Sequence, residues 1–348
     1  MNTALQVWDG ELSVITTPPP RVSAPTDVVV KVAFSGVCGT DLHVLSKEFP
    51  CAKSVVLGHE FSGVVTEVGS EVKHCSVGER VAINPNSSCG NCHYCFKGQP
   101  HFCPVGAINN SIGLWRNGGW AHFCRVPASQ VHPIPTQITL EAAVFVEPIS
   151  CILRGWDQLA PLPTDADILI CGTGIIGLLF ASIAHFRGYR RVILTEISEQ
   201  RRALASGMKL GFNIVHPESL EILHKQGITN NDVTWGFDAI IDCTGSPKAI
   251  QQAFNWLRHG ATFCIFGCCP KRSEIKINPF DVVFKEIKLV GSLINPFTFP
   301  RALQLVQDMS KDYLDYKKLG VEMFKLEDYA QALSTLKSGK ISKAVFEI

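Results

Sequence analysis

The chain has 348 residues, of which 46% are hydrophobic and 18% charged, and 32 Lys and Arg against 31 Asp and Glu give a formal net charge of +1. This length exceeds what one hydrophobic core usually serves, so we expect two domains. The lack of basic or acidic runs argues against a nucleic-acid partner and against an anionic membrane surface. The first residues lack the charged and apolar regions of a secretory signal, which favours a cytoplasmic protein.

Residues 1–150 contain short β-type runs that Gly, Pro and Asn interrupt. Alternation of apolar and polar residues is clear over Val28–Phe34 and Ser62–Val68, and the runs GERVAINP and WAHFCRVP have the same character. We expect strands at these places, in an all-β or barrel-like domain.

Two short motifs in this part offer side chains that bind metals. The run CGTDLH begins at Cys38 and brings a thiolate, a hydroxyl and an imidazole within six residues, while GHE places His59 beside Glu60. A catalytic zinc ion needs about three protein ligands of N, S or O type and one open position. Cys38 and His59 can supply two ligands, and Glu60 or Glu147 the third.

Four cysteines lie close together in the run CGNCHYCFKGQPHFC, at Cys89, Cys92, Cys95 and Cys103. Disulfides, an iron–sulfur cluster and a metal ion are the three candidate chemistries. Fourteen cysteines in a chain without an export signal indicate a reducing compartment, which disfavours disulfides. The spacing before the last cysteine is longer than in the bacterial ferredoxin run. We therefore predict a closed structural zinc site with four thiolate ligands.

From about residue 151 apolar runs alternate with helical patterns, which indicates a doubly wound parallel sheet. The uncharged segment Ile168–Ala184 is shorter than the ~20 residues of a membrane-spanning helix, and its glycines favour a buried strand followed by a helix. After Leu293 the pattern becomes mixed again, and we expect the final strand to return to the first domain.

The run GTGIIG within that segment matches the GxGxxG signature of a dinucleotide-binding turn. Its positions are Gly172, Gly174, Ile176 and Gly177, directly after a predicted strand and at the start of a helix. The next strand is expected to end at Glu196, where a carboxylate would accept hydrogen bonds from the adenosine ribose.

Together these motifs resemble the zinc-dependent medium-chain alcohol dehydrogenases, and among them the polyol, or sorbitol dehydrogenase-like, branch. The segment GHEFSGVVTEVGSEV has glycines at the family's positions, and CGTD, the four-cysteine loop, the EP pair at Glu147, GxGxxG and DCTG occur in family order. The resemblance covers nearly the whole chain. It implies an α/β protein with a GroES-like β-rich catalytic domain and a Rossmann doubly wound parallel-sheet domain, with zinc in the cleft between them.

On this basis we assign residues 1–150 and 293–348 to the GroES-like catalytic domain, with residues 89–103 as its structural zinc loop. Residues 151–292 form the expected Rossmann dinucleotide-binding domain.

The resemblance also implies roles at the metal. Cys38 and His59 would bind the catalytic zinc ion, with Glu60 as a ligand and Glu147 holding a water ligand, although which glutamate binds directly stays open. In the ethanol-type branch a cysteine near this region is the third ligand. Because Glu147 matches that place, Cys151 is not expected to bind.

The same resemblance implies roles in proton transfer, in orienting a metal ligand and in cofactor binding. Thr40 would take the alcohol proton and pass it through the nicotinamide ribose to His43 and solvent, and Asp41 would orient a metal ligand. Arg201 matches an arginine near the adenosine ribose, whereas Arg202 is expected to point to solvent.

One departure concerns the substrate. Sorbitol enzymes carry a tyrosine just after the histidine of the CGTD run and an arginine in the loop after the last Rossmann strand. Val44 and the pair Ile294 and Asn295 stand at the matching places here. These substrate-near residues favour a different polyol or a less polar secondary alcohol.

We therefore expect oxidation of a secondary alcohol, most simply a sugar alcohol, with NAD and two zinc ions per chain, one catalytic and one structural. An L-threonine-type or other vicinal-alcohol dehydrogenase is the alternative within enzymes, and a non-catalytic cofactor-binding relic is the alternative outside them. The resemblance implies a homo-oligomer, with a tetramer favoured and a dimer possible.

Overall fold

The computed structural model describes residues 1–230, 232 and 234–348, and the chain divides into two compact units. The first unit comprises Met1–Leu153, Ile294–Lys317 and Val321–Ile348. The second comprises Arg154–Leu293 and Lys318–Gly320. The carboxyl-terminal segment of the chain therefore packs with the amino-terminal part.

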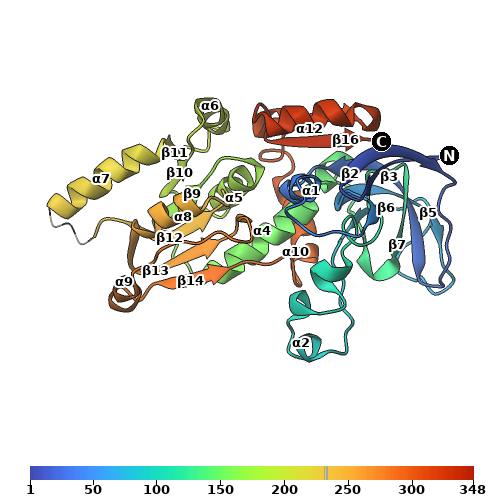
Figure 1. The fold of residues 1–348 in the computed structure, drawn as a ribbon, viewed down its shortest axis with the longest axis horizontal. Helices are drawn as coiled ribbons and strands as arrows, with labels where there is room; N and C mark the ends of the chain where they lie inside the picture. The colour runs from blue at the N-terminus through green and yellow to red at the C-terminus, as the bar shows by residue number, and fades with distance from the viewer. Residues whose placement is uncertain (231, 233) are drawn as a thin grey trace. The chain divides into compact units, whose positions relative to one another are not determined.

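The first unit is built mainly from β-strands (Figure 1). Among the described residues, a mixed seven-stranded sheet runs in the order β15-β16-β3-β5-β6-β8, with β7 paired to β3, and a three-stranded antiparallel sheet runs β2-β1-β4. The strands are β1 Asn2–Trp8, β2 Glu11–Thr17, β3 Asp27–Gly36, β4 Ser54–Val56, β5 Glu60–Val68, β6 Arg80–Ile83, β7 Phe123–Pro127, β8 Val131–Pro133, β15 Val321–Lys325 and β16 Lys343–Glu347.

These strands confirm the β-rich prediction for the amino-terminal part. The two alternating runs lie within β3 and β5, which pair antiparallel and bury one face in a common core. The last strand, β16, pairs antiparallel with β3, so the expected return of the chain end to the first unit is confirmed.

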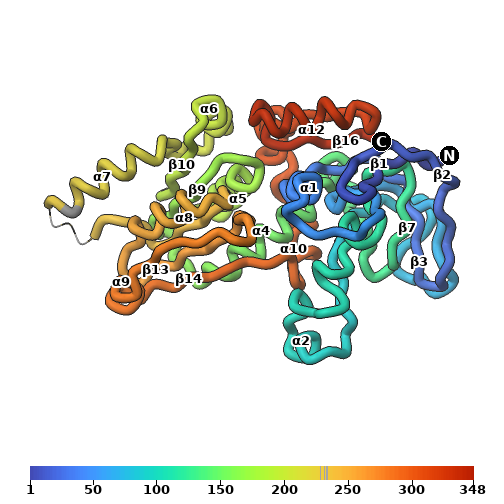
Figure 2. Tube along the Cα trace, in the orientation of Figure 1, coloured from blue at the N-terminus to red at the C-terminus, as the bar shows by residue number. Residues whose placement is uncertain are grey.

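Helices join the strands of the first unit, and two of them continue into residues of the second unit. The helix α2 lies in a lobe that stands apart from those strands (Figure 2). The helices are α1 Gly39–Leu45, α2 His93–Phe96, α3 Leu140–Ala143, α4 Val146–Leu159, α10 Phe299–Met309, α11 Tyr316–Leu319 and α12 Tyr329–Lys337, with 3-10 turns η1 Pro100–Phe102, η2 Ala107–Asn110, η3 Ala128–Gln130 and η4 Leu326–Asp328.

The second unit is a Rossmann fold. Its described strands form one parallel sheet in the order β11-β10-β9-β12-β13-β14, which is the doubly wound order 3-2-1-4-5-6 when they are numbered along the chain. The strands are β9 Ile168–Cys171, β10 Val192–Thr195, β11 Asn213–Val215, β12 Phe237–Asp242, β13 Leu257–Ile265 and β14 Lys288–Gly291. The helices are α5 Ile175–Phe186, α6 Glu199–Gly207, α7 Pro217–Thr229, α8 Pro247–Phe254 and α9 Pro279–Phe284.

The apolar segment that begins at Ile168 forms β9 and then α5, as the glycine pattern predicts. Every residue of β9 is buried, because a central parallel strand is covered on both faces. The helix α5 packs on β9 and β10, and α8 packs on β12 and β13. Within the described residues, no helix is long and apolar enough to cross a membrane.

Candidate active site

The pairing of β3 with β5 brings the two predicted metal-binding motifs together. Cys38 follows the end of β3, Glu60 begins β5, and the register sets Gly36 opposite Glu60. One ligand atom each from Cys38, His59 and Glu60 lies within 4.8 Å of the others. Thiolate, imidazole and carboxylate are all zinc ligands, so the donor set fits a catalytic zinc ion with an open position.

Asp41 supports this group from the first turn of α1. Its Oδ2 accepts a hydrogen bond from the backbone N–H of Cys38 at 2.8 Å, and its Oδ1 lies 3.3 Å from His59 Nδ1. A carboxylate beside one ring nitrogen of a histidine leaves the other, Nε2, for a metal. The expected orienting role of Asp41 therefore has a structural basis in these two contacts.

The same neighbours govern protonation of His59. Burial alone would lower the pKa of this imidazole, but the Asp41 carboxylate and the Cys38 sulfur raise it well above its ordinary value. Metal binding requires the neutral imidazole, so a metal ion and the second ring proton compete for the same nitrogen of His59.

The helix α4 adds the buried Glu147 and the partly buried Cys151 from its first turns. Burial, with a further contribution from Glu60, raises the pKa of Glu147 to about 7. Cys151 lies one helical turn later, and its Sγ is 3.5 Å from Glu147 Oε1. Neither residue belongs to the closely spaced ligand group of the described residues. The geometry therefore favours Glu60 over Glu147 as the third direct ligand.

Thr40 and His43 follow Cys38 on α1. The Thr40 hydroxyl lies 3.7 Å from the Cys38 sulfur, so it borders the metal-binding group. His43 Nδ1 lies 2.6 Å from Glu48 Oε2, and about a third of its side chain is exposed. When the Glu48 carboxylate accepts from Nδ1, the Nε2 atom of His43 is the acceptor, which suits an outlet for protons to solvent.

The three residues expected near the substrate have different surroundings. Val44 is 2% exposed and packs in the hydrophobic core with Val37 and Leu57. Ile294, at a φ of +44°, lines a cavity of about 240 Å³ in the first unit together with Asn295. Their places near a substrate stay predictions.

The Asn295 side chain is held by the protein itself. It donates to Asn84 Oδ1 at 3.1 Å and to Ser150 Oγ at 2.8 Å, and it accepts from Asn86 Nδ2 at 2.8 Å. Only 3% of the residue is exposed. This network fixes the loop that follows Leu293.

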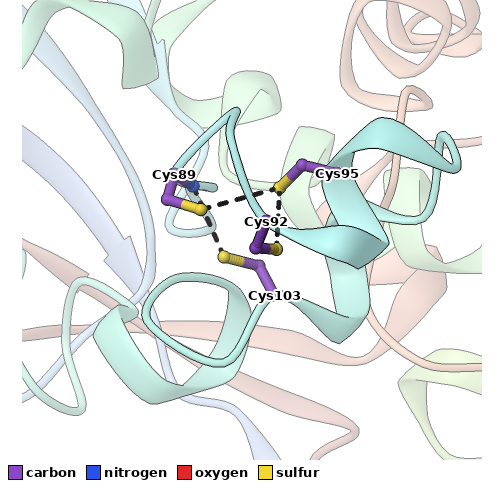
Figure 3. Close-up of side chains that lie close together, drawn as sticks. All are labelled: Cys89, Cys92, Cys95 and Cys103. Atoms are coloured by element: carbon purple, nitrogen blue, oxygen red, sulfur yellow. Dashed lines mark hydrogen bonds between the residues drawn. The ribbon is translucent and has the colours of Figure 1, made fainter.

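The four-cysteine loop forms a second metal-binding group (Figure 3). Sulfur–sulfur distances are 3.5 Å between Cys92 and Cys95 and 4.0 Å between Cys89 and Cys95. Zinc–sulfur bonds of ~2.3 Å in a tetrahedron require sulfurs roughly 3.8 Å apart, so the spacing fits zinc. Burial opposes ionisation of Cys103, but backbone N–H groups, that of Cys89 first, lower its pKa to about 7.

The GxGxxG turn joins β9 to α5 in the second unit. Gly172 has a φ of +94°, and a Cβ on Gly177 would collide with the carbonyl oxygen of Gly172. A Cβ on Gly174, in contrast, would meet nothing within 4 Å, which leaves open space at the amino end of α5. Ile176 lies in the first turn of this helix. Such a turn suits close approach of a pyrophosphate to the backbone.

Glu196 follows β10 and lies beside the glycine turn. Its Oε2 accepts from the Thr173 N–H at 3.0 Å and its Oε1 from the Ser198 N–H at 3.0 Å. Arg201 lies in the first turn of α6, where its backbone N–H donates to the Oγ of the N-cap residue Ser198 at 3.4 Å. Arg202 was expected to point to solvent, but this is wrong: its guanidinium donates to the carbonyls of Glu196 and Ile197, each at 2.8 Å.

Lys343 is a site residue that the sequence analysis missed. It is 1% exposed, its Nζ contacts Glu60 Oε2, and it donates to the Val37 carbonyl at 3.2 Å. Burial opposes its charge, yet the Glu60 carboxylate raises its pKa above the ordinary value. A lysine within the apolar final strand was the only signal in the sequence. Glu48 was also missed as the partner of His43, whereas Cys151 lies outside the ligand group, in keeping with the expectation that it does not bind.

The comparisons with known proteins identify the family of the chain. Residues 24–136 match the alcohol dehydrogenase GroES-like domain, and residues 176–308 match the zinc-binding dehydrogenase domain. D-arabinitol dehydrogenase 1 of Uromyces fabae is 29% identical over 322 residues, which are 91% of this chain and 88% of that protein. L-threonine 3-dehydrogenase of Rhizobium etli (strain CIAT 652) is 31% identical over 336 residues, 95% and 93% of the two chains.

A solved structure extends the likeness to the whole chain. A chain from Sinorhizobium meliloti 1021, assigned as a zinc-binding dehydrogenase and bound to NADP, has a TM-score of 0.88 and 31% identity, and covers 100% of this chain and 99% of its own. The fold and the ligand groups define an oxidoreductase of the zinc-dependent type. This protein belongs to the zinc-binding alcohol dehydrogenase family.

The four-cysteine lobe gives the first testable prediction. Cys95→Ser removes a thiolate ligand, so we expect one zinc equivalent to be lost and the free energy of unfolding to fall by more than about 3 kcal/mol, because structural zinc stabilises the fold directly. Metal analysis and thermal unfolding measure both effects. The control is Cys268→Ser, an exposed thiol outside both groups. Normal zinc content in Cys95→Ser would contradict the assignment.

Proposed function

We propose that this dehydrogenase oxidises a secondary alcohol, most simply a sugar alcohol, to the ketone, with zinc held by Cys38, His59 and Glu60 and with NAD as hydride acceptor. The observation that carries the proposal is a group of three ligand atoms, all within 4.8 Å of one another and two of them from buried residues, beside the Thr40 hydroxyl. Glu147 lies next to this group and is available to hold a water.

The substrate class rests on the relatives. The match to D-arabinitol dehydrogenase 1 supports a polyol, whereas the match to L-threonine 3-dehydrogenase supports the alternative vicinal alcohol. Pentitols, hexitols, L-threonine and simple secondary alcohols should be compared by the absorbance of the reduced cofactor. We expect the highest kcat/KM for a pentitol or hexitol. A higher value for L-threonine would replace the polyol proposal.

A non-catalytic, cofactor-binding role is the remaining alternative. The persistence of a complete ligand set with its orienting carboxylate, Asp41, argues against it. No turnover of any alcohol in that panel, with cofactor binding retained, would favour the alternative.

The residues around the metal group account for proton movement. A zinc ion at this place supplies Lewis acidity, which lowers the pKa of an alcohol oxygen. The Thr40 hydroxyl is placed to take up the proton of the alcohol while it releases its own proton, and the partly exposed His43 is placed to pass a proton on to solvent. Glu48 fixes the His43 ring so that Nε2 receives the proton. The protein thus supplies geometry, while NAD supplies the redox chemistry.

Thr40 provides the test of this proton route. Thr40→Val keeps the shape of the side chain and removes its hydroxyl, so we expect kcat to fall about 10²–10⁴-fold. Thr40→Ser is the matched control and should keep most of the activity. His43→Gln should lose less, and added imidazole should restore part of its rate. A Thr40→Val rate within about threefold of the unmodified protein would exclude the route.

We further propose that Glu196 selects NAD over NADP. A carboxylate at the end of the second Rossmann strand accepts from both ribose hydroxyls and repels a 2′-phosphate. Arg201 is the basic residue that we place near the ribose, as a stacking or pairing partner. The relative from Sinorhizobium meliloti binds NADP, so membership of the family does not determine whether NAD or NADP is used. The proposal therefore rests on the carboxylate of Glu196.

The expected preference is a kcat/KM for NAD at least about 10²-fold above that for NADP, since repulsion and lost hydrogen bonds together exceed ~3 kcal/mol. Glu196→Ala should lower efficiency with NAD and raise it with NADP. Glu199→Ala, an exposed acid at the start of α6, is the matched control. If Glu196→Ala loses NAD efficiency without gaining any with NADP, Glu196 only supports the glycine turn.

Quaternary structure and location complete the proposal. We infer a cytoplasmic homo-oligomer, a tetramer by resemblance. Exposed apolar side chains on α9, in the sheet-edge strand β14 and just after it support association, namely Phe280, Val283, Phe284, Leu289 and Leu293. No disulfide joins the cysteines that the structure describes, which suits a reducing compartment. A monomer in sedimentation experiments would exclude the oligomer.

A further inference from the structure

The buried ammonium group of Lys343 has no part in the proton route described above. Its Nζ contacts Glu60 Oε2 and donates to the Val37 carbonyl, so the amino group binds a candidate metal ligand on one side and backbone on the other. Lys343 and Glu60 are each 1% exposed. Water therefore cannot replace either partner without a change in the core.

The three adjacent strands β16, β3 and β5 create the space for this pair. Val345 lies opposite Gly36, and Gly36 lies opposite Glu60, so Lys343 reaches past the end of β3. A Cβ at Gly36 would collide with the Glu60 carboxylate and lie 2.8 Å from Lys343 Cε. The absent side chain at Gly36 thus leaves room for a lysine to hold the outer oxygen of Glu60.

The charges around Lys343 are those of the metal-binding group. Its ammonium interacts electrostatically with Glu60 first, then with Cys38 and Glu147. A divalent ion at the same group would attract the same three anions. The ammonium and the ion therefore share one set of partners, and each weakens the hold of the other.

We propose that Lys343 is a positioning residue that competes with the metal for Glu60. By holding Oε2, Lys343 leaves Oε1 for the metal and weakens Glu60 as a ligand. A weakly held ligand can leave or shift, which opens a coordination position for the alcohol. This inference rests on the proposed function, specifically on Glu60 as a ligand of the catalytic zinc.

The test measures metal affinity apart from turnover. Protein that keeps zinc in the four-cysteine lobe but lacks metal at Cys38 is titrated with Co²⁺, followed by visible absorption. Lys343→Met removes the charge at similar length, so we expect Co²⁺ to bind about tenfold more tightly or better, and kcat of the zinc enzyme to fall at least about tenfold. Tighter metal with slower turnover is the signature of competition.

Lys325→Met is the matched control. Lys325, on the neighbouring strand β15, forms an ion pair with Glu347 at 2.8 Å, but this pair is exposed and belongs to neither ligand group. Lys325→Met should change neither the affinity for Co²⁺ nor the kcat of the zinc enzyme. Lys343→Gln keeps a hydrogen-bond donor for Glu60 without its charge, and it should also bind Co²⁺ more tightly. It serves as the second variant if Lys343→Met does not fold.

Unchanged or weaker Co²⁺ binding in a folded Lys343 variant would overturn the inference, because a purely structural lysine predicts that result. Failure of the proposed function looks different: the unmodified protein would bind Co²⁺ at Cys38 and yet oxidise no alcohol. The comparison of affinities would still decide the role of Lys343 in that case.

Discussion

The candidate active site depends on one constraint, which is the balance of charge among side chains that are largely removed from water. Cys38, Glu60 and Glu147 can each carry a negative charge there, and an unpaired buried charge is costly. Lys343 compensates Glu60 directly. The pKa of Glu147, raised to about 7, shows how little further negative charge the surroundings accept. A divalent ion would complete the balance, so the same constraint that stabilises the fold also favours metal binding.

The strand pairing of the first unit meets this constraint with residues that are far apart in the sequence. The partners Lys343 and Glu60 are 283 positions apart, and β3 lies between their strands. Asp41, at the start of α1, orients Cys38 and His59 through one carboxylate. All three ligand residues of the metal-binding group therefore lie in the β-rich unit, where strand pairing brings them together.

Patterns local in the sequence predicted most of the fold and the ligand groups. The four-cysteine loop, the glycine turn and the strands β3 and β5 are each encoded within a short stretch, where spacing and alternation are informative. Lys343 and the Asn295 network were not predictable in this way. Their partners come from other strands or helices, and which side chains meet there depends on the register of pairing, which a sequence pattern alone does not give.

The central claim is that Cys38, His59 and Glu60 hold a catalytic zinc distinct from the one in the cysteine lobe. Metal analysis of the unmodified protein and of His59→Ala, with turnover and NAD binding measured on the same samples, tests it most directly. The account predicts about two zinc ions per chain for the first and about one for the second. His59→Ala should lose turnover yet still bind NAD, because the glycine turn belongs to the other unit. Normal turnover with unchanged zinc content in His59→Ala would contradict the account.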